Sequence, residues 1–217
     1  MSRLQDPRVA SVLDRLHLAA GSDDERAAAV PDPPAGQEPL TAAERADAAD
    51  MLYMPISREA GVLAYSLIRA SRPTLVVEFG TSMGISTIYL AAAVADNGAG
   101  RVVSTELSAR KVIAAGQSLA DAGLDAVVQI LEGDARETLA TIAEPVGILL
   151  LDGWKELYLP VLQLLEPWLP AGALVLADDS SFSSLQPYCT YVRDPGNGYE
   201  SVSFPVEDGV EISCRTA

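Results

Sequence analysis

The stretch LVVEFGTSMGISTIYLAAAVADNGAGRVVSTE, residues 75–106, decides the fold class of this chain. It begins with a short apolar run, passes through a glycine-containing loop into an alanine-rich helical pattern, and ends in a second apolar run. A strand, a helix and a strand in this order are typical of a parallel βαβ unit. Because helices cover both faces of a parallel sheet, we expect strands that are buried on both faces.

The same alternation continues to the C-terminal side of this unit. We expect strands at 75–79, 101–106, 126–131, 146–152 and 173–178, and helices at 84–95, 108–122, 135–143, 156–166 and 181–192. Two further strand-like runs, 199–206 and 209–214, are joined by Glu207-Asp208-Gly209, which is a hairpin signal. The pattern predicts an α/β fold with a mostly parallel seven-stranded sheet, a terminal antiparallel hairpin and helices on both faces.

The first 70 residues follow a different pattern. Apolar residues recur at helical spacing over 4–20, and Thr41 with Glu44 forms a capping box that opens a helix reaching about Asp50. A further helix is expected over 57–70, ended by the proline at 73. Between them, residues 21–40 are rich in proline, glycine and acids, which predicts a loop or connector.

We therefore predict a single domain over 1–217, made of an N-terminal helical cap (1–70) and an α/β core (74–217). The cap would close over a substrate or form the interface of a homodimer, and the sequence leaves both possibilities open.

Composition excludes several classes of protein. With 49% hydrophobic and 21% charged residues the chain is not disordered, and its net charge of −15 disfavours a nucleic-acid partner. Two cysteines, Cys189 and Cys214, and one histidine, His17, are too few for a disulfide framework or a cysteine-rich zinc site. The chain has neither a long apolar run nor a signal-peptide pattern, so we expect a cytoplasmic protein without a membrane span.

Three loops at successive strand ends carry polar groups that suit a nucleoside. Gly80 and Gly84 leave room for a ligand near the backbone, and Glu106 would accept hydrogen bonds from a ribose diol. Asp134 would accept one from an adenine amino group. Read separately, the glycines also fit a tight turn and each acid fits a helix N-cap. Ligands of open α/β sheets bind at this edge, so we favour the nucleoside site.

The next two strands end in LLLDGWK and LADDSS, which contain Asp152, Asp178 and Asp179. Three carboxylates at neighbouring strand ends would repel one another unless a cation neutralises them, and Mg²⁺ suits such ligands. The alternative is that Asp178 and Asp179 only cap the following helix. Lys155 is one of only two lysines beside 13 arginines, the other being Lys111, for which the pattern indicates no role.

The segments quoted above, and especially LLLDGWKELYLPVLQLLEPWLPAGALVLADD at 149–179, resemble the class I S-adenosylmethionine-dependent O-methyltransferases. The resemblance is strongest to catechol O-methyltransferase and bacterial small-molecule O-methyltransferases, and it implies a Rossmann-like fold. It implies that Asp152, Asp178 and Asp179 hold Mg²⁺ and that Lys155 is the general base. It also implies a set of residues around the cofactor: Met54, Ile56, Glu78, Gly80, Thr81, Ser82, Gly84, Ser86, Glu106, Leu107, Asp134, Ala135, Asp152 and Trp154.

These implied roles match the chemistry of methyl transfer. The reaction needs an aligned acceptor that has lost its proton, and lysine, unlike arginine, can take up a proton near neutral pH beside a bound dication. The chain departs from the family pattern at Asp179, where asparagine is usual, and at Gly153, where the catechol enzyme has histidine. A catechol acceptor therefore does not follow, and we expect a small hydroxylated molecule.

Two other classes of function remain open from the sequence. One is a metal-independent N- or O-methyltransferase, in which the paired acids are helix caps. The other is a nucleoside-cofactor-binding protein without transfer activity. A nucleotide-dependent oxidoreductase is disfavoured because the GxGxxG pattern of dinucleotide sites is missing.

Overall fold

The computed structural model describes residues 2–28 and 41–217. Its centre is a seven-stranded sheet with the order β3-β2-β1-β4-β5-β7-β6. The first five strands are parallel, and β7 pairs antiparallel with both β5 and β6. The predicted fold is therefore confirmed. The strands are β1 (Leu75–Phe79), β2 (Arg101–Glu106), β3 (Val128–Glu132), β4 (Ile148–Leu151), β5 (Leu174–Ala177), β6 (Tyr199–Phe204) and β7 (Val210–Arg215).

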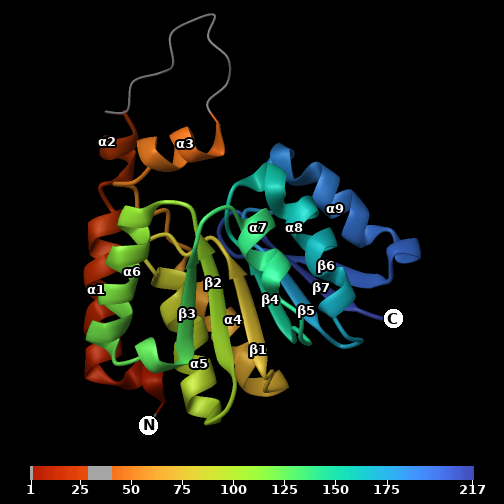
Figure 1. Cartoon of the computed structure of the whole chain (residues 1–217), viewed down its shortest axis with the longest axis horizontal. Coiled ribbons are helices and arrows are strands. Elements are labelled where there is room, and N and C mark those ends of the chain that lie inside the picture. The colour runs from red at the N-terminus through yellow and green to blue at the C-terminus, as the bar shows by residue number, and fades with distance from the viewer. Residues whose placement is uncertain (1, 29–40) are drawn as a thin grey trace, which may run out of the picture.

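Helices cover both faces of the sheet (Figure 1). The helices of one face are α1 (Pro7–Ala20), α4 (Arg58–Ser71), α5 (Ile85–Asn97) and α6 (Ala109–Ala122), and those of the other are α7 (Ala135–Thr138), α8 (Tyr158–Leu165) and α9 (Gln186–Arg193). Alternate residues of β1 enter the two cores, since Val76 packs with the first set and Leu75 and Val77 with the second. All five β1 residues are buried, which explains why four of them are apolar.

The structure corrects the predicted bounds of some elements. Residues 23–28, expected in a loop, form helix α2 (Asp23–Ala28), whose first turn carries three acids that favour a helix N-terminus. The remainder of the predicted connector, 29–40, lies outside the described residues. Strand β3 begins at Val128 because 125–127 form a 3₁₀ turn. The helices predicted at 135–143, 156–166 and 181–192 are shorter α-helices flanked by 3₁₀ turns.

The N-terminal helices divide into two groups. Helix α1 packs against α5 and α6, and α4 packs against α5, so both extend the helical layer beside the sheet. Helices α2 and α3 (Ala42–Ala48) lie at the end of the molecule that Figure 1 shows at the top. The capping box that opens α3 is confirmed, because Glu44 N donates to Thr41 Oγ1 and Thr41 N donates to Glu44 Oε2. None of the described helices is long and apolar enough to cross a membrane.

The contact between α4 and α5 depends on a glycine without special backbone angles. A Cβ atom on Gly61 would lie 2.5 Å from the ring of Tyr89, which is 3% exposed. Gly116 in α6 is the matched case, since a Cβ there would meet no atom within 4 Å. Both glycines lie inside helices, so the two positions differ only in the atoms that an added Cβ would meet.

We expect Gly61→Ala and Gly116→Ala to change stability in opposite directions. Overpacking at Gly61 costs about 1–3 kcal/mol and exceeds the helix-propensity gain of about 1 kcal/mol, whereas Gly116→Ala keeps the gain. Urea unfolding of the two variants measures both free energies. Equal stabilisation by the two substitutions would contradict the packing of α4 on α5.

Candidate functional site

A cavity lies where the parallel strands end, beneath α3. We name it the strand-end cavity. It is lined by Ala42, Ala46, Ala49, Met54, Phe79, Gly80, Ser82, Thr105, Glu106, Leu107, Lys111, Gly133, Asp134, Ala135, Asp152, Gly153, Trp154 and Leu157. These residues come from the loops after β1, β2, β3 and β4 and from the N-terminal helices. The position is the usual ligand site of an open α/β sheet.

The glycine loop after β1 is pressed against the end of β4. Gly80 has φ +105°, and a Cβ there would lie 2.4 Å from the backbone oxygen of Asp152. Asp152 N in turn donates to the carbonyl of Phe79 at 2.8 Å. Only glycine combines this backbone angle with so close an approach. The contact therefore fixes the floor of the cavity relative to Asp152.

Glu106 ties the glycine loop to the end of β2. Its Oε2 accepts a hydrogen bond from Ser82 N at 2.8 Å, and its Oε1 accepts one from Ser108 N at 2.9 Å. A carboxylate oxygen has two lone pairs, so each oxygen keeps one free for a further donor. The role of Glu106 toward a ribose diol remains a prediction that this geometry allows. Ser82 has φ +47°, a strained backbone angle that often marks a functional site.

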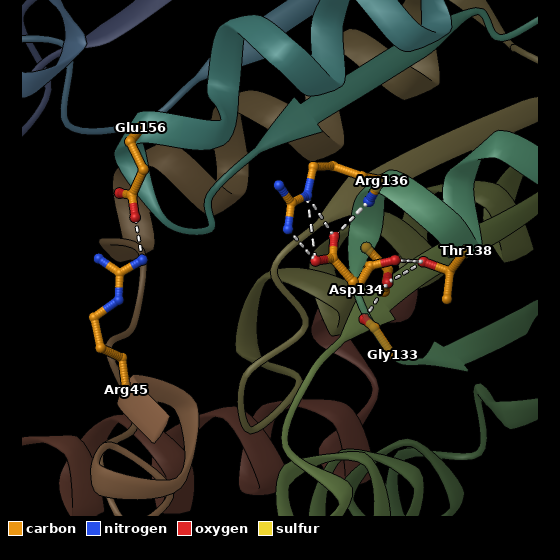
Figure 2. A network of polar contacts seen from close by, with 7 residues as sticks. Arg45, Gly133, Asp134, Arg136, Thr138 and Glu156 are labelled. Atoms are coloured by element: carbon orange, nitrogen blue, oxygen red, sulfur yellow. Dashed lines mark hydrogen bonds and ion pairs between the residues drawn. The ribbon is translucent and has the colours of Figure 1, made fainter. Parts of the chain in front are cut away.

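Asp134 has the helix-capping role that the sequence offered as the alternative. Its Oδ1 accepts a hydrogen bond from Arg136 N at 2.8 Å, and the Arg136 guanidinium donates hydrogen bonds to both carboxylate oxygens (Figure 2). Hydrogen bonding to this guanidinium holds the pKa of Asp134 below its usual value. Asp134 nevertheless lines the cavity, where it offers a fixed negative charge at the end of β3.

Glu78 is a buried carboxylate with an unused oxygen. The residue is fully buried at the end of β1, and its Oε2 accepts hydrogen bonds from the hydroxyls of Thr87 and Ser104. Within the part of the chain that the structure describes, its Oε1 has no partner, and burial raises its pKa. A buried polar atom without a partner is costly. The place of Glu78 beside a cofactor remains a prediction, since the residue does not line the cavity.

Asp152, Asp178 and Asp179 form a cluster of carboxylates beside the cavity. One oxygen from each lies within 4.8 Å of the others. Lys155 Nζ lies 2.7 Å from Asp179 Oδ2 and 3.8 Å from Asp152 Oδ1, and it donates to the hydroxyl of Tyr158 at 2.8 Å. The cluster and the cavity share Asp152. The side chains that the sequence selected as metal ligands and base are therefore brought together.

Charge repulsion within this carboxylate cluster is not fully compensated by Lys155. Burial and the neighbouring Asp179 raise the pKa of Asp178 to about 7. Burial and Asp178 likewise raise the pKa of Asp152 well above its usual value. Three oxygen ligands with this geometry and charge fit a hard divalent cation, which would replace the protons. The side chains of Asp178 and Asp179 do not cap the following 3₁₀ turn or helix.

The terminal hairpin supports the loop that carries two of the three acids. Ser180 N donates to the carbonyl of Gly209, and Ser181 N donates to that of Asp208, both at 2.9 Å. A Cβ on Gly209 would lie 2.6 Å from Ser180 Oγ. Asp179 itself has φ +59°, which acidic and amide residues tolerate better than most. The turn between β6 and β7 therefore holds the conformation of the acidic loop.

Helix α3 forms the roof of the cavity through a stripe of small residues, Ala42, Ala46 and Ala49. Arg45 of the same helix forms an ion pair with Glu156 (Figure 2), and its guanidinium lies 4.8 Å from the centre of the Trp154 ring. Sequence reasoning missed these alanines as site residues. Their spacing could have identified them, because alanines four and three residues apart after the capping box lie on one face of a helix.

The residues predicted around the cofactor separate into two layers. Nine of them line the cavity: Met54, Gly80, Ser82, Glu106, Leu107, Asp134, Ala135, Asp152 and Trp154. The other five do not line it, and all of them are buried: Ile56, Glu78, Thr81, Gly84 and Ser86. Thr81 hydrogen-bonds Ser104, which in turn donates to Glu78. Lys111, for which the sequence indicated no role, is a cavity residue.

Residues 77–180 match the family model described as "Methyltransferase domain". This part of the chain therefore resembles a methyltransferase domain. Its relatives include catechol O-methyltransferase B of Danio rerio, which is 30% identical over 174 residues, covering 74% of this chain and 65% of that protein. The catechol O-methyltransferase of Mycobacterium tuberculosis is 31% identical over 147 residues, covering 66% of each chain. The resemblance predicted from the sequence is confirmed.

A solved structure supports the same conclusion for the fold. The crystal structure of cofactor-bound Rv0187 from MTB superposes with a TM-score of 0.69 at 25% identity, covering 84% of this chain and 92% of that one. The chain spans slightly less than two thirds of the length of these two catechol O-methyltransferases.

We expect the carboxylate cluster to lower the stability of the metal-free protein as the pH rises. The folded state holds a proton on Asp178 up to about pH 7, whereas the unfolded chain releases it near the ordinary value, so stability falls across this window. Asp178→Asn removes the charge and would raise Tm at pH 8 by a few degrees in chelator, with a smaller gain at pH 5.

Thermal unfolding at the two pH values measures this effect. Asp121→Asn is the control, because Asp121 is a half-exposed acid on α6 that pairs with Arg15. The interpretation is wrong when Asp178→Asn gives the same change at both pH values.

Proposed function

We propose that the protein is an S-adenosylmethionine-dependent O-methyltransferase that needs a divalent cation, with Mg²⁺ as the first candidate. Its acceptor would be a small hydroxylated molecule, with phenols as the first class to test. The observation that carries the proposal is the convergence of Asp152, Asp178 and Asp179 with Lys155 at one end of the strand-end cavity. Kinship with catechol O-methyltransferases supports the reaction class.

The polar groups of the cavity fit a nucleoside that carries an amino acid. Glu106 and Asp134 line the cavity and offer carboxylate oxygens at the ends of β2 and β3, and the buried Glu78 lies behind the lining near the end of β1. Several solved methyltransferases of the same fold hold S-adenosylmethionine or its product, among them TomG from Streptomyces achromogenes. S-adenosylmethionine has a ribose diol, an adenine and an ammonium group, so its functional groups match these acids.

Lys155 is the proposed base. It is the basic side chain in contact with the carboxylate cluster, and Asp179 and the Tyr158 hydroxyl hold its amine in place. In its neutral form the amine would take the proton of the acceptor hydroxyl and leave an oxygen nucleophile for the methyl group. A divalent cation held by Asp152, Asp178 and Asp179 would supply Lewis-acid stabilisation of that oxygen. Trp154 and α3 would exclude water and align the reactants.

A metal-independent methyltransferase is the second candidate. It would explain the cavity without the cluster, but it leaves the raised pKa values of Asp152 and Asp178 without a purpose. The metal-independent candidate also requires that Asp178 and Asp179 serve as helix caps, but their side chains do not cap the following 3₁₀ turn or helix. We therefore prefer the metal-dependent reaction.

Removing divalent cations tests this choice. Methyl transfer from S-adenosylmethionine to a panel of phenols, catechols and aliphatic alcohols should fall at least about a hundredfold in EDTA and return with Mg²⁺ or Mn²⁺. Asp178→Asn and Asp179→Asn should raise the metal concentration needed for half-maximal rate. Full activity in chelator would favour the second candidate. Absence of transfer to any acceptor, with S-adenosylhomocysteine bound normally, would instead leave only the binding function.

Substitution of Lys155 tests the base. Lys155→Arg keeps the positive charge beside Asp179 but cannot accept a proton near neutral pH, so kcat should fall about 10²–10⁴-fold. Affinity for S-adenosylhomocysteine should stay within about twofold, because Lys155 is not a cavity-lining residue. Tyr158→Phe is the matched variant, since it removes the hydroxyl that Lys155 contacts and retains the amine. Normal kcat in Lys155→Arg would exclude the base role.

A further inference from the structure

Lys111 presents a buried positive charge to the strand-end cavity. It belongs to the first turn of α6, directly after the loop that follows β2, and only 4% of its surface is exposed. It lines the same cavity as Glu106 and Gly80. Burying an ammonium group is costly unless an anion or several acceptors compensate it. The contacts of the Lys111 ammonium group therefore indicate which kind of ligand it binds.

The contacts of the ammonium group leave donors unused. Lys111 Nζ lies 3.2 Å from Ser82 Oγ and 3.9 Å from Met54 Sδ. Ser82 Oγ donates its own proton to the carbonyl of Tyr53, so it is an acceptor for Lys111. A thioether is only a weak acceptor. Within residues 2–28 and 41–217, no carboxylate oxygen lies within 4 Å of this ammonium nitrogen.

The acids that surround Lys111 at longer range are each held by other groups. Glu106 accepts two backbone amides, and Asp23 pairs with Arg26 while it also accepts the amides of Tyr53 and Met54. The two remaining acids follow the same rule: Asp50 pairs with Arg110, and Asp152 lies beside Lys155. Burial lowers the pKa of Lys111 and these four acids raise it. Burial outweighs the acids, so the net shift of this pKa is downward. None of the four acids lies within 4 Å of the ammonium nitrogen, so its free donors suit an anion that enters the cavity.

We propose that Lys111 binds the carboxylate of the cofactor's amino-acid end, which rests on the function proposed above. This carboxylate is the single anionic group of S-adenosylmethionine. Lys111 reaches the glycine loop through Ser82, which lines the same cavity, so a carboxylate beside this loop would lie within reach of its amine.

An acidic acceptor is the other source of a carboxylate, and the topology disfavours it. The carboxylate cluster and Lys155 follow β4 and β5, whereas Lys111 follows β2, and β1 lies between the two halves of the edge. The acceptor hydroxyl is expected at the cluster. Lys111 therefore belongs to the half of the cavity that holds the cofactor.

Calorimetry with two ligands tests the proposal without any measurement of activity. The ligands are S-adenosylhomocysteine and its decarboxylated analogue, which retains the amine. Lys111→Met removes the charge from a side chain of similar length and should weaken S-adenosylhomocysteine binding about ten- to a hundredfold, as expected for a charged hydrogen bond. Its affinity for the decarboxylated analogue should equal that of the unaltered protein. Lys111→Arg should recover part of the loss.

A control variant and a second ligand class separate the possible outcomes. Arg15→Met removes one positive charge, as Lys111→Met does, but at an exposed site on α1. The Arg15→Met protein should bind both ligands with the affinity of the unaltered protein. If Lys111→Met weakens the binding of both ligands equally, Lys111 has a structural role and the proposal is overturned. Unchanged S-adenosylhomocysteine affinity, with loss of a preference for 3,4-dihydroxybenzoate over catechol, would overturn it in favour of the acceptor. Failure of the unaltered protein to bind S-adenosylhomocysteine would refute the proposed function itself.

Discussion

The close approach of the Gly80 backbone to Asp152 is the constraint on which the site depends. Parallel pairing sets β1 beside β4, and the glycine loop can then touch the end of β4 because Gly80 has no side chain. The same contact fixes one wall of the strand-end cavity and one member of the carboxylate cluster. Larger residues at position 80 would separate the two halves of the site.

The charged residues along the carboxyl edge of the sheet form two groups, and each group suits a different kind of ligand. On the β3–β1 side, backbone amides or Arg136 engage the acids, and Lys111 has no ion-pair partner among residues 2–28 and 41–217. On the β4–β5 side, three carboxylates crowd around one lysine, and burial opposes their ionisation. The first arrangement suits a zwitterionic nucleoside, and the second suits a divalent cation.

Much of the fold could be predicted because each strand is short, apolar and followed by a clear helix signal. The predicted strands at 75–79 and 101–106 have the observed bounds, since proline and glycine end the neighbouring elements. Helix α2 was missed because its acids were interpreted as part of a polar connector, although acids also favour the first turn of a helix. The shortened helices after β3, β4 and β5 reflect 3₁₀ turns, which periodicity does not distinguish from α-helix.

The sequence by itself determined which residues end the strands, because burial requires apolar strands and leaves polar chemistry to the loops that follow. It therefore selected Glu106, Asp152, Asp178, Asp179 and Lys155 before any contact was known. Only the tertiary structure decided that α3 roofs the cavity and that Arg136 engages Asp134. It also decided that Lys111 faces the cavity, where no acid of the described residues pairs with it. These contacts join segments far apart in the chain or depend on the direction of a long side chain, and local patterns encode neither.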